Sequence, residues 1–387
     1  MSTLCLPPLS LYVHIPWCIK KCPYCDFNSH THSDAALPES AYVDALLEDL
    51  AHEASPAKLQ GRQLVSIFFG GGTPSLFSAS AIARILTGAE QLIGFSPTIE
   101  ITLEANPGTV EQQKFKGFRQ AGINRLSIGI QSFNDLQLKR LGRIHNASEA
   151  LNAVAIARRA GFDNVNLDLM HGLPEQTPEQ ALADLRQAVD LQPEHLSWYQ
   201  LTIEPNTAFH HQPPLLPVEN TLEHIQTQGQ QLLANAGFNT YEVSAYARPE
   251  RRSQHNCNYW QFGDYLGVGA GAHGKITDID AQQILRTRKT RQPTDYLSRL
   301  TKKESYLAEQ LSLNMAERPL EFLMNALRLS QGVPVTMFTE RTGLPLTAIA
   351  THWQTLEAKK LVKPLATGRL CCTALGQRFL DSILAEF

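Results

Sequence analysis

The sequence predicts an α/β fold: a partial (β/α)6 barrel of the TIM type, followed by a small helical domain similar to a winged helix. Two observations lead to this prediction. Six apolar runs of strand length alternate with helix-patterned segments in the first half of the chain. Strands that are apolar nearly throughout, each followed by a helix, are typical of a parallel sheet covered by helices.

The expected elements follow one another in a regular order. Several of the helical segments end at glycine, the residue that best adopts a left-handed C-cap. Thr177 and Pro178 are typical of a helix start, with threonine as N-cap and proline at the first helical position. The expected strands cover residues 9–15, 64–70, 99–105, 125–131, 164–170 and 195–203, and the helices 39–54, 78–94, 109–122, 147–161 and 177–192.

The pattern changes after about residue 300 to helices and a short hairpin. We therefore expect three parts: a barrel core over 1–210, an extension over 211–300 and a small C-terminal domain over 301–387. Residues 338–362 have the spacing of a helix-turn-helix followed by a wing. No basic stripe marks the second helix, so a packing or docking module is favoured over DNA binding.

Composition excludes several classes of function. A net charge of −3 does not suit a general nucleic-acid binder, and no run of eighteen apolar residues is present. The N-terminus lacks the basic and apolar regions of a secretory signal, so we expect a cytoplasmic protein with at most peripheral membrane contact. The seven cysteines are odd in number and clustered, which favours a reducing compartment and a metal site over disulfides.

Five polar or glycine-rich loops follow the expected strands. In a β/α barrel the functional site lies at the C-terminal ends of the strands. The loops are therefore expected to converge on one rim. They are the cysteine loop after the first strand, "GGGTP" (70–74), "EANP" (104–107), "IQSF" (130–133) and "LDLMHGLP" (167–174).

The cysteine loop has the spacing C-x3-C-x2-C, formed by Cys18, Cys22 and Cys25. Zinc is one interpretation, with Asp26, His14 or His30 as a fourth ligand, but no second CxxC pair is present. A [4Fe–4S] cluster normally takes four thiolates, so three would leave one iron open to an exogenous ligand. "GGGTP" lacks side chains at three positions, so its backbone can approach such a ligand closely.

The segment "HNCNYW" (255–260) combines a histidine with aromatic surface. His255 and Tyr259 are four residues apart and would share one face of a short helix, while Trp260 and Phe262 offer flat apolar surface. A neutral imidazole is a common haem-iron ligand. From the residues alone, a structural histidine is the more frequent explanation. His273 is a second candidate ligand and Cys257 a weaker one.

The chain resembles the HemW group of the radical S-adenosylmethionine (SAM) superfamily, relatives of oxygen-independent coproporphyrinogen III oxidase. The resemblance covers almost the whole chain. It rests on "LYVHIPWCIKKCPYCDFNSH", "FFGGGTPSL", "EANPGT", "GIQSF", "LDLMHGLP" and "HNCNYWQFGDYLGVGAGAHG".

The resemblance implies a set of cofactors and residues. Cys18, Cys22 and Cys25 would hold a [4Fe–4S] cluster whose open iron binds SAM, and Tyr24 would contact a second SAM. A b-type haem would bind near His255. The positions that match SAM-binding residues of the wider family are Tyr12, Gly71, Gly72, Thr73, Glu104, Gln131, Arg143 and Asp168.

The implied function is that of a haem chaperone that passes haem to acceptor haemoproteins such as respiratory enzymes. A haem-donor protein and a homodimer also fit this interpretation, and nucleic acid does not. The alternative is an oxygen-independent coproporphyrinogen III dehydrogenase, a radical SAM oxidative decarboxylase. The oxidases carry a fourth cysteine where this chain has Phe27, and a long N-terminal arm that is not expected here. Oxidase activity is therefore not expected, and no catalytic residue is assigned.

Overall fold

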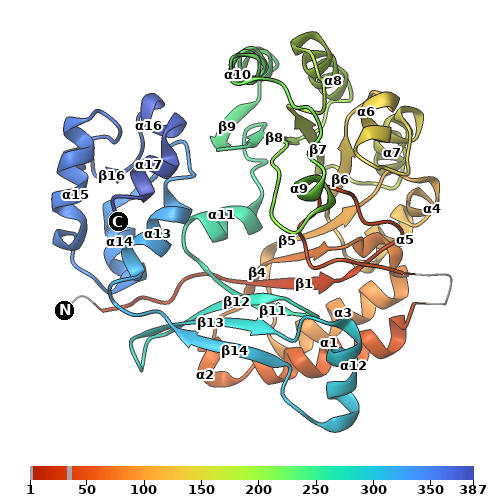
Figure 1. The fold of residues 1–387 in the computed structure, drawn as a ribbon. Helices are drawn as coiled ribbons and strands as arrows, with labels where there is room; N and C mark the ends of the chain where they lie inside the picture. The colour runs from red at the N-terminus through yellow and green to blue at the C-terminus, as the bar shows by residue number, and fades with distance from the viewer. Residues whose placement is uncertain (1–2, 33–36) are drawn as a thin grey trace.

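The computed structural model describes residues 3–32 and 37–387, and one twelve-stranded sheet runs through them (Figure 1). Its centre is six parallel strands in chain order, as expected for a partial (β/α)6 barrel. The barrel is open, because its first and last strands each pair onward with further strands. The six strands are β1 (Leu9–Ile15), β4 (Leu64–Gly71), β5 (Phe95–Ala105), β6 (Arg125–Gln131), β7 (Val165–His171) and β8 (His195–Gln200).

The central strands are not apolar throughout, and this corrects the reason for which they were predicted. In β4 the side chains of Ser66 and Phe68 face the barrel interior, while Ile67 and Phe69 are buried in the outer core under the helices. In β7, Asn166 and Asp168 face inward and Leu167 and Leu169 pack in that same outer core. The period of two therefore separates an apolar outer layer from a polar interior.

Helices cover the outer face of the central strands (Figure 1). The helix expected over 109–122 is two helices, and Lys114 lies at the break between them. Its ammonium group donates to the carbonyls of Ser75, Leu76 and Phe77 at 3.0, 2.7 and 3.4 Å. The helices are α1 (Glu39–Glu53), α3 (Ala79–Leu92), α4 (Thr109–Gln112), α5 (Phe115–Ala121), α7 (Ala147–Arg159), α8 (Pro178–Asp190) and α10 (Glu219–Asn235).

Additional strands extend the sheet at both edges. After β8 the chain forms an antiparallel pair at one edge, and then crosses to the other edge to pair with β1. This second extension begins parallel to β1 and continues as an antiparallel meander. The added strands are β9 (Asn239–Glu242), β10 (Ala245–Ala247), β11 (Asp264–Val268), β12 (His273–Asp278), β13 (Gln283–Lys289) and β14 (Leu307–Ser312).

The C-terminal segment forms a second layer of helices beside the barrel (Figure 1). Its core continues into the sheet extension, since Phe322 and Trp353 belong to the same buried cluster as Tyr241, Phe262 and Ile284. The expected helix-turn-helix corresponds to α14 and α15, with a short β15–β16 pair as the wing. The elements are α13 (Arg318–Ala326), β15 (Val333–Pro334), α14 (Val335–Thr342), α15 (Thr347–Ala358), η2 (Leu365–Thr367), β16 (Arg369–Leu370), α16 (Ala374–Arg378) and α17 (Leu380–Leu384).

The remaining elements are short. Within the described residues, no helix has the length and apolar character that crossing a bilayer requires. The boundaries 1–210, 211–300 and 301–387 stay a prediction. The short elements are β2 (Trp17–Cys18), β3 (His30–Thr31), α2 (Pro56–Leu59), η1 (Pro74–Leu76), α6 (Asp135–Arg140), α9 (Ala208–His211), α11 (Gln254–Trp260) and α12 (Pro293–Lys302).

Asp264 fixes the start of β11 against the barrel. Its buried carboxylate accepts hydrogen bonds from Arg62 and Lys275, both at 2.7 Å, and from the backbone and hydroxyl of Thr277. Burial alone would raise the pKa of Asp264, but the two cations hold it below its usual value. Its contribution to stability is thus present above the unfolded-state pKa, near 4, and is lost as the pH falls through the lower folded-state pKa.

We predict that Asp264→Asn destabilises the fold at pH 7 by about 3–5 kcal/mol, because it leaves two largely buried cations without their counter-ion. The difference from the unmodified protein should shrink below about pH 4. Urea unfolding followed by circular dichroism measures both effects. Asp44→Asn, which removes an exposed partner of Arg84, is the control and should change stability by less than about 1 kcal/mol. Equal unfolding midpoints for Asp264→Asn and the unmodified protein would refute this role.

Candidate functional site

The cysteine loop is closed at its base by two short strands. Trp17 and Cys18 pair in parallel with His30 and Thr31, and the amide of His32 donates to the carbonyl of Cys18 at 2.9 Å. Inside the loop, the ammonium group of Lys21 donates to the carbonyls of Phe27 and Ser29. These bonds hold the loop over the carboxyl end of β1, the position predicted from the barrel rule.

The three thiols are half-buried, free and line a single pocket. Each sulfur has a polar neighbour: the hydroxyl of Thr73 for Cys18 at 3.6 Å, the guanidinium of Arg143 for Cys22 at 3.6 Å, and the hydroxyl of Ser29 for Cys25 at 3.8 Å. Burial raises the pKa of the Cys18 and Cys25 thiols. Both therefore carry a proton until a metal displaces it.

The thiols can be compared with the two kinds of metal site considered for this loop. In the described part of the chain, no three His, Cys, Asp or Glu side chains converge as the ligands of one metal ion would. A tetrahedral zinc site needs that convergence. The four irons of a [4Fe–4S] cluster form a wider body, whose thiolate ligands stand further apart. The residues present therefore fit such a cluster, with Cys18, Cys22 and Cys25 as its ligands.

The pocket beside the thiols has a volume of about 340 Å3 and lies at the carboxyl ends of β4 to β8. Eight of the expected SAM-related residues line it together with the three cysteines. Tyr12 does not line it and borders a neighbouring cavity instead. The eight are Tyr24, Gly71, Gly72, Thr73, Glu104, Gln131, Arg143 and Asp168.

The glycines of "GGGTP" allow close packing within the protein, whereas we expected them to let the backbone approach a ligand. A β-carbon on Gly71 would come within 2.4 Å of the His14 ring, and one on Gly72 within 2.5 Å of the carbonyl oxygen of Trp17. The Gly71 amide points to the Glu104 carboxylate at 3.3 Å, and the Gly72 and Thr73 amides donate to carbonyls of the β1–β2 segment at 2.8 Å. These donors are therefore already used within the protein.

Two buried carboxyl groups line the pocket, together with the cations of Lys20 and Arg143. Burial, and then the nearby charge of Asp168, raise the pKa of Glu104 to about 8. Burial also raises the pKa of Asp168, although Ser127 donates to its carboxylate at 2.9 Å and Asn166 at 2.8 Å. A cationic ligand would stabilise the ionised form of both groups. SAM, with its sulfonium and ammonium groups, has this charge.

Arg143 and Gln131 also line the pocket. The guanidinium of Arg143 donates to Asn106 at 2.7 Å and to the carbonyl of Gly129 at 2.8 Å, while its Nε has no partner among the described residues. Gln131 has a φ of +68°, which is strained for a residue other than glycine. Tyr199 donates to its side-chain oxygen at 2.9 Å and holds it toward the pocket.

Among the polar residues that line the pocket, sequence reasoning missed four that lie on the central strands or directly after one of them. A signal existed for three of them: Ser127, Ser197 and Tyr199 alternate with buried apolar residues along their strands, so period two assigns them to the interior. Treating the strands as apolar throughout hid this alternation. The four residues are Asn106, Ser127, Ser197 and Tyr199.

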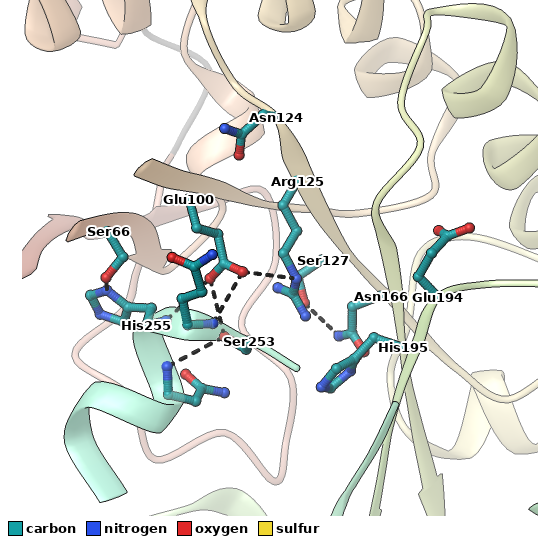
Figure 2. A network of polar contacts seen from close by, with 12 residues as sticks. Ser66, Glu100, Asn124, Arg125, Ser127, Asn166, Glu194, His195, Ser253 and His255 are labelled. Carbon is teal, nitrogen blue, oxygen red and sulfur yellow. Dashed lines mark hydrogen bonds and ion pairs between the residues drawn. The ribbon is translucent and has the colours of Figure 1, made fainter. Parts of the chain in front are cut away.

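His255 is enclosed inside the barrel at the amino ends of the strands (Figure 2). Its Nδ1 lies 2.9 Å from the hydroxyl of Ser66 and its Nε2 lies 2.8 Å from the hydroxyl of Tyr259. Burial lowers the pKa of His255 to about 3, so the ring is neutral. Coordination of haem iron by His255 stays a prediction, and it would require one of these hydrogen bonds to break.

Helix α11, which carries His255, begins on the carboxylate of Glu100 (Figure 2). This carboxylate accepts hydrogen bonds from the amides of Gln254 and His255, both at 3.1 Å. Asn258 ties the same helix to the hydroxyl of Ser10 and to the carbonyl of Asp264, each at 2.9 Å. The histidine and this asparagine of "HNCNYW" therefore anchor the helix.

The open parallel barrel with a three-cysteine loop over its carboxyl end defines the class, a radical SAM protein. In agreement, the Radical SAM superfamily model matches residues 12–188, and the HemN C-terminal domain model matches residues 313–379. Membership of this superfamily implies a [4Fe–4S] cluster and SAM.

Curated relatives define the family more narrowly. The chain is 51% identical to the heme chaperone HemW of Haemophilus influenzae, covering 99% of this chain and 98% of that protein. It is 50% identical to the heme chaperone HemW of Escherichia coli over 92% of this chain and 96% of that one. The chain belongs to the HemW family of radical SAM proteins.

Two more distant relatives extend the comparison. A mitochondrial radical S-adenosyl methionine domain-containing protein 1 of Mus musculus is 36% identical over 97% of this chain and 86% of its own length. Among solved structures, coproporphyrinogen III oxidase (HemN) from Escherichia coli matches with a TM-score of 0.82 and 24% identity, over 98% of this chain and 90% of that one. At this identity the likeness shows a shared fold.

Replacing Cys18, Cys22 or Cys25 by Ala should abolish the cluster, because two thiolates do not hold it. After anaerobic reconstitution, the unmodified protein should carry about four irons and have the brown colour of the cluster, and each variant should lose most of both. Cys5→Ala is the matched control, since Cys5 is exposed and lines neither pocket. Full iron content in any of the three variants would show that the ligand set is wrong.

Replacing Glu104 by Gln should stabilise the ligand-free protein more at pH 8.5 than at pH 5.5. The raised folded-state pKa means that the glutamate contributes stability at low pH and loses it as the pH rises toward about 8. Glutamine stays uncharged at every pH, so the variant does not lose this stability as the pH rises. The same variant should bind SAM more weakly, because a negative charge that favours the cation is gone. Thermal unfolding and SAM titration test the two effects, with exposed Glu90→Gln as control. A pH-independent difference in stability would contradict the assigned protonation.

Proposed function

We propose that this protein is a cytoplasmic haem chaperone that carries one [4Fe–4S] cluster, binds SAM and haem, and passes haem to acceptor haemoproteins such as respiratory enzymes. The observation that carries this proposal is 50–51% identity, over nearly the whole chain, to two proteins named heme chaperone HemW. The cysteine pocket supports the cofactor part, because its thiols and carboxyl groups suit an iron–sulfur cluster and a cationic ligand.

Each part of the pocket has a distinct proposed role. Cys18, Cys22 and Cys25 hold three irons and leave the fourth to SAM, which supplies one-electron chemistry when bound. Thr73 and Arg143 donate to two of the sulfurs, and such hydrogen bonds tune the potential of a cluster.

The remaining polar groups of the pocket orient SAM. Glu104 and Asp168 face its positive charges. Arg143, Gln131 and the aromatic ring of Tyr24 bound the space in which its other parts lie.

Coproporphyrinogen III dehydrogenase is the second candidate, since HemN shares this fold along nearly the full chain. Phe27 argues against it. The side chain is 61% exposed beside the thiols, at the position where the oxidases carry a fourth cysteine. A phenyl ring offers neither a ligand nor a proton donor there. A haem donor, a homodimer and peripheral membrane contact remain compatible with the chaperone proposal.

One preparation tests both candidates. The protein is reconstituted anaerobically with iron and sulfide and then divided. One part is titrated with ferric haem and monitored at the Soret band, and the other is incubated with coproporphyrinogen III, SAM and a low-potential reductant. We expect stoichiometric haem binding, transfer of the haem to an apo-haemoprotein and no protoporphyrinogen. Conversion of coproporphyrinogen without haem binding would overturn the chaperone proposal in favour of the oxidase.

A further inference from the structure

A second, larger cavity of about 650 Å3 lies next to the cysteine pocket. Its floor is formed by the antiparallel strands β11, β12 and β13, where Tyr265, Lys275 and Arg286 stand side by side in register. His273 and Arg288 form the next row, since these two residues are paired across β12 and β13. The volume lies within the range of about 300–1,000 Å3 typical of small-molecule sites.

We propose that the haem cargo binds in this cavity, with His273 as ligand of the iron and with Arg288 and Arg291 binding the propionates. This inference rests on the proposed chaperone function and adds the location and the residues of the haem site. It assigns the ligand role to a histidine outside the "HNCNYW" segment. Haem makes three demands on a site: an open imidazole for the iron, cations for two carboxylates and apolar surface for the macrocycle.

His273 is the open imidazole of the cavity. His14 also borders it, but its Nδ1 lies 3.0 Å from the hydroxyl of Tyr12 and its Nε2 lies 2.9 Å from the carbonyl of Asn28. His255 is likewise bonded at both nitrogens. The side chain of His273 is exposed and has no hydrogen-bond partner in the described part of the chain.

The electrostatic surroundings of His273 keep it neutral. Partial burial, and then the positive charges of Arg288 and Arg286, lower its pKa, against a smaller opposing effect of Glu309. His14 is the other titratable ring nearby, and burial lowers its pKa to about 4. A neutral ring presents the lone pair that a metal requires.

Cations are concentrated in the lining of this cavity although the whole chain has a net charge of −3. Lys275 and Lys289 are committed to buried carboxylates at 2.5–2.7 Å. Arg288 is different, because its bond to Glu309 is an exposed ion pair at 3.3 Å, which contributes little stability. Arg291 donates to the neutral side chain of Asn28. Both guanidinium groups can therefore turn to a propionate, for which their geometry is well suited.

The aromatic surface comes from helix α11 and from the cysteine loop. Tyr259 and Trp260 line one wall, and the ring of Tyr259 packs against that of Tyr265 with 4.5 Å between centroids. Phe27 borders both this cavity and the cysteine pocket. A flat macrocycle would therefore lie between these rings, directly beside the cluster loop.

The iron ligand is tested by comparing ferric haem with metal-free protoporphyrin IX on the cluster-reconstituted full chain. His273→Ala should weaken ferric haem binding by about tenfold or more and shift the Soret band. Its affinity for metal-free protoporphyrin, which has no iron to coordinate, should stay unchanged. His224→Ala is the control, because His224 is exposed on α10 and lines neither cavity. Unchanged haem affinity and Soret position in His273→Ala would overturn the assignment.

The propionate site is tested with the double variant Arg288→Met and Arg291→Met. It should lose affinity for haem and for metal-free protoporphyrin alike, by several-fold, and should not lose affinity for protoporphyrin dimethyl ester, which carries no carboxylates. The matched control is Arg84→Met, an exposed arginine on α3 far from the cavity lining. Equal loss for the acid and the ester would show that the arginines act through packing and would overturn their assignment to the propionates.

The reference measurements separate this inference from the function on which it rests. If the unmodified protein binds no haem, the chaperone proposal fails. If it binds haem and His273→Ala does so equally well, only the location fails. His255→Ala distinguishes an anchoring histidine from an iron ligand. If His255 only anchors α11, the variant should unfold at a lower temperature and leave the Soret position of bound haem unchanged. A Soret shift in His255→Ala without one in His273→Ala would assign the iron to His255.

Discussion

The placement of helix α11 depends on one buried carboxylate, that of Glu100. This carboxylate stands at the amino end of the barrel interior and accepts hydrogen bonds from the first free amides of the helix (Figure 2). It lies 4.0 Å from the buried guanidinium of Arg125. Its negative charge lies at the positive end of the helix dipole and stabilises the helix in this position. The helix, so held, closes the amino end of the barrel. Access to the interior is left at the carboxyl end, under the cysteine loop, while the last turn of α11 supplies a wall of the neighbouring cavity.

The two cavities meet at the cysteine loop but differ in charge. Glu104 and Asp168 make the pocket at the carboxyl end of the barrel suitable for a cation, whereas Arg286, Arg288 and Arg291 make the larger cavity suitable for an anion. SAM carries a sulfonium and an ammonium group, and haem carries two propionates. A ligand group with the same charge as the site would be repelled more strongly than in water, because the dielectric constant of a partly buried pocket is low. In the proposed arrangement the two carboxyl groups favour SAM and the three arginines favour haem, and Phe27 borders both cavities.

Local sequence patterns were sufficient to predict the central strands, because strand signals depend on neighbours within about ten residues. The rule that parallel strands end at one edge then placed the rim loops together. The cysteine ligand set stays a prediction. An extension over 211–300 was predicted, but the pairing of its strands was not, because that pairing is long-range: β11 lies beside β1, and Asp264 meets Arg62 across 202 positions. The pattern of apolar residues within 264–289 does not indicate which strand of the barrel they pair with. The environment of His255 was hidden for the same reason, since its partner Ser66 is 189 positions away.

The residues of the segment "HNCNYW" lie in two different environments. Along α11, His255 and Asn258 turn into the barrel and bond Ser66 and Ser10, whereas Tyr259 and Trp260 reach the cavity wall. The hydrogen bond between His255 and Tyr259 joins the two functions, because the buried imidazole fixes the position of the phenol that borders the cavity. Chemistry alone favoured a structural histidine at this position, and the geometry supports that reading. The histidine with an open ring, His273, stands at the start of β12 and lines the same cavity.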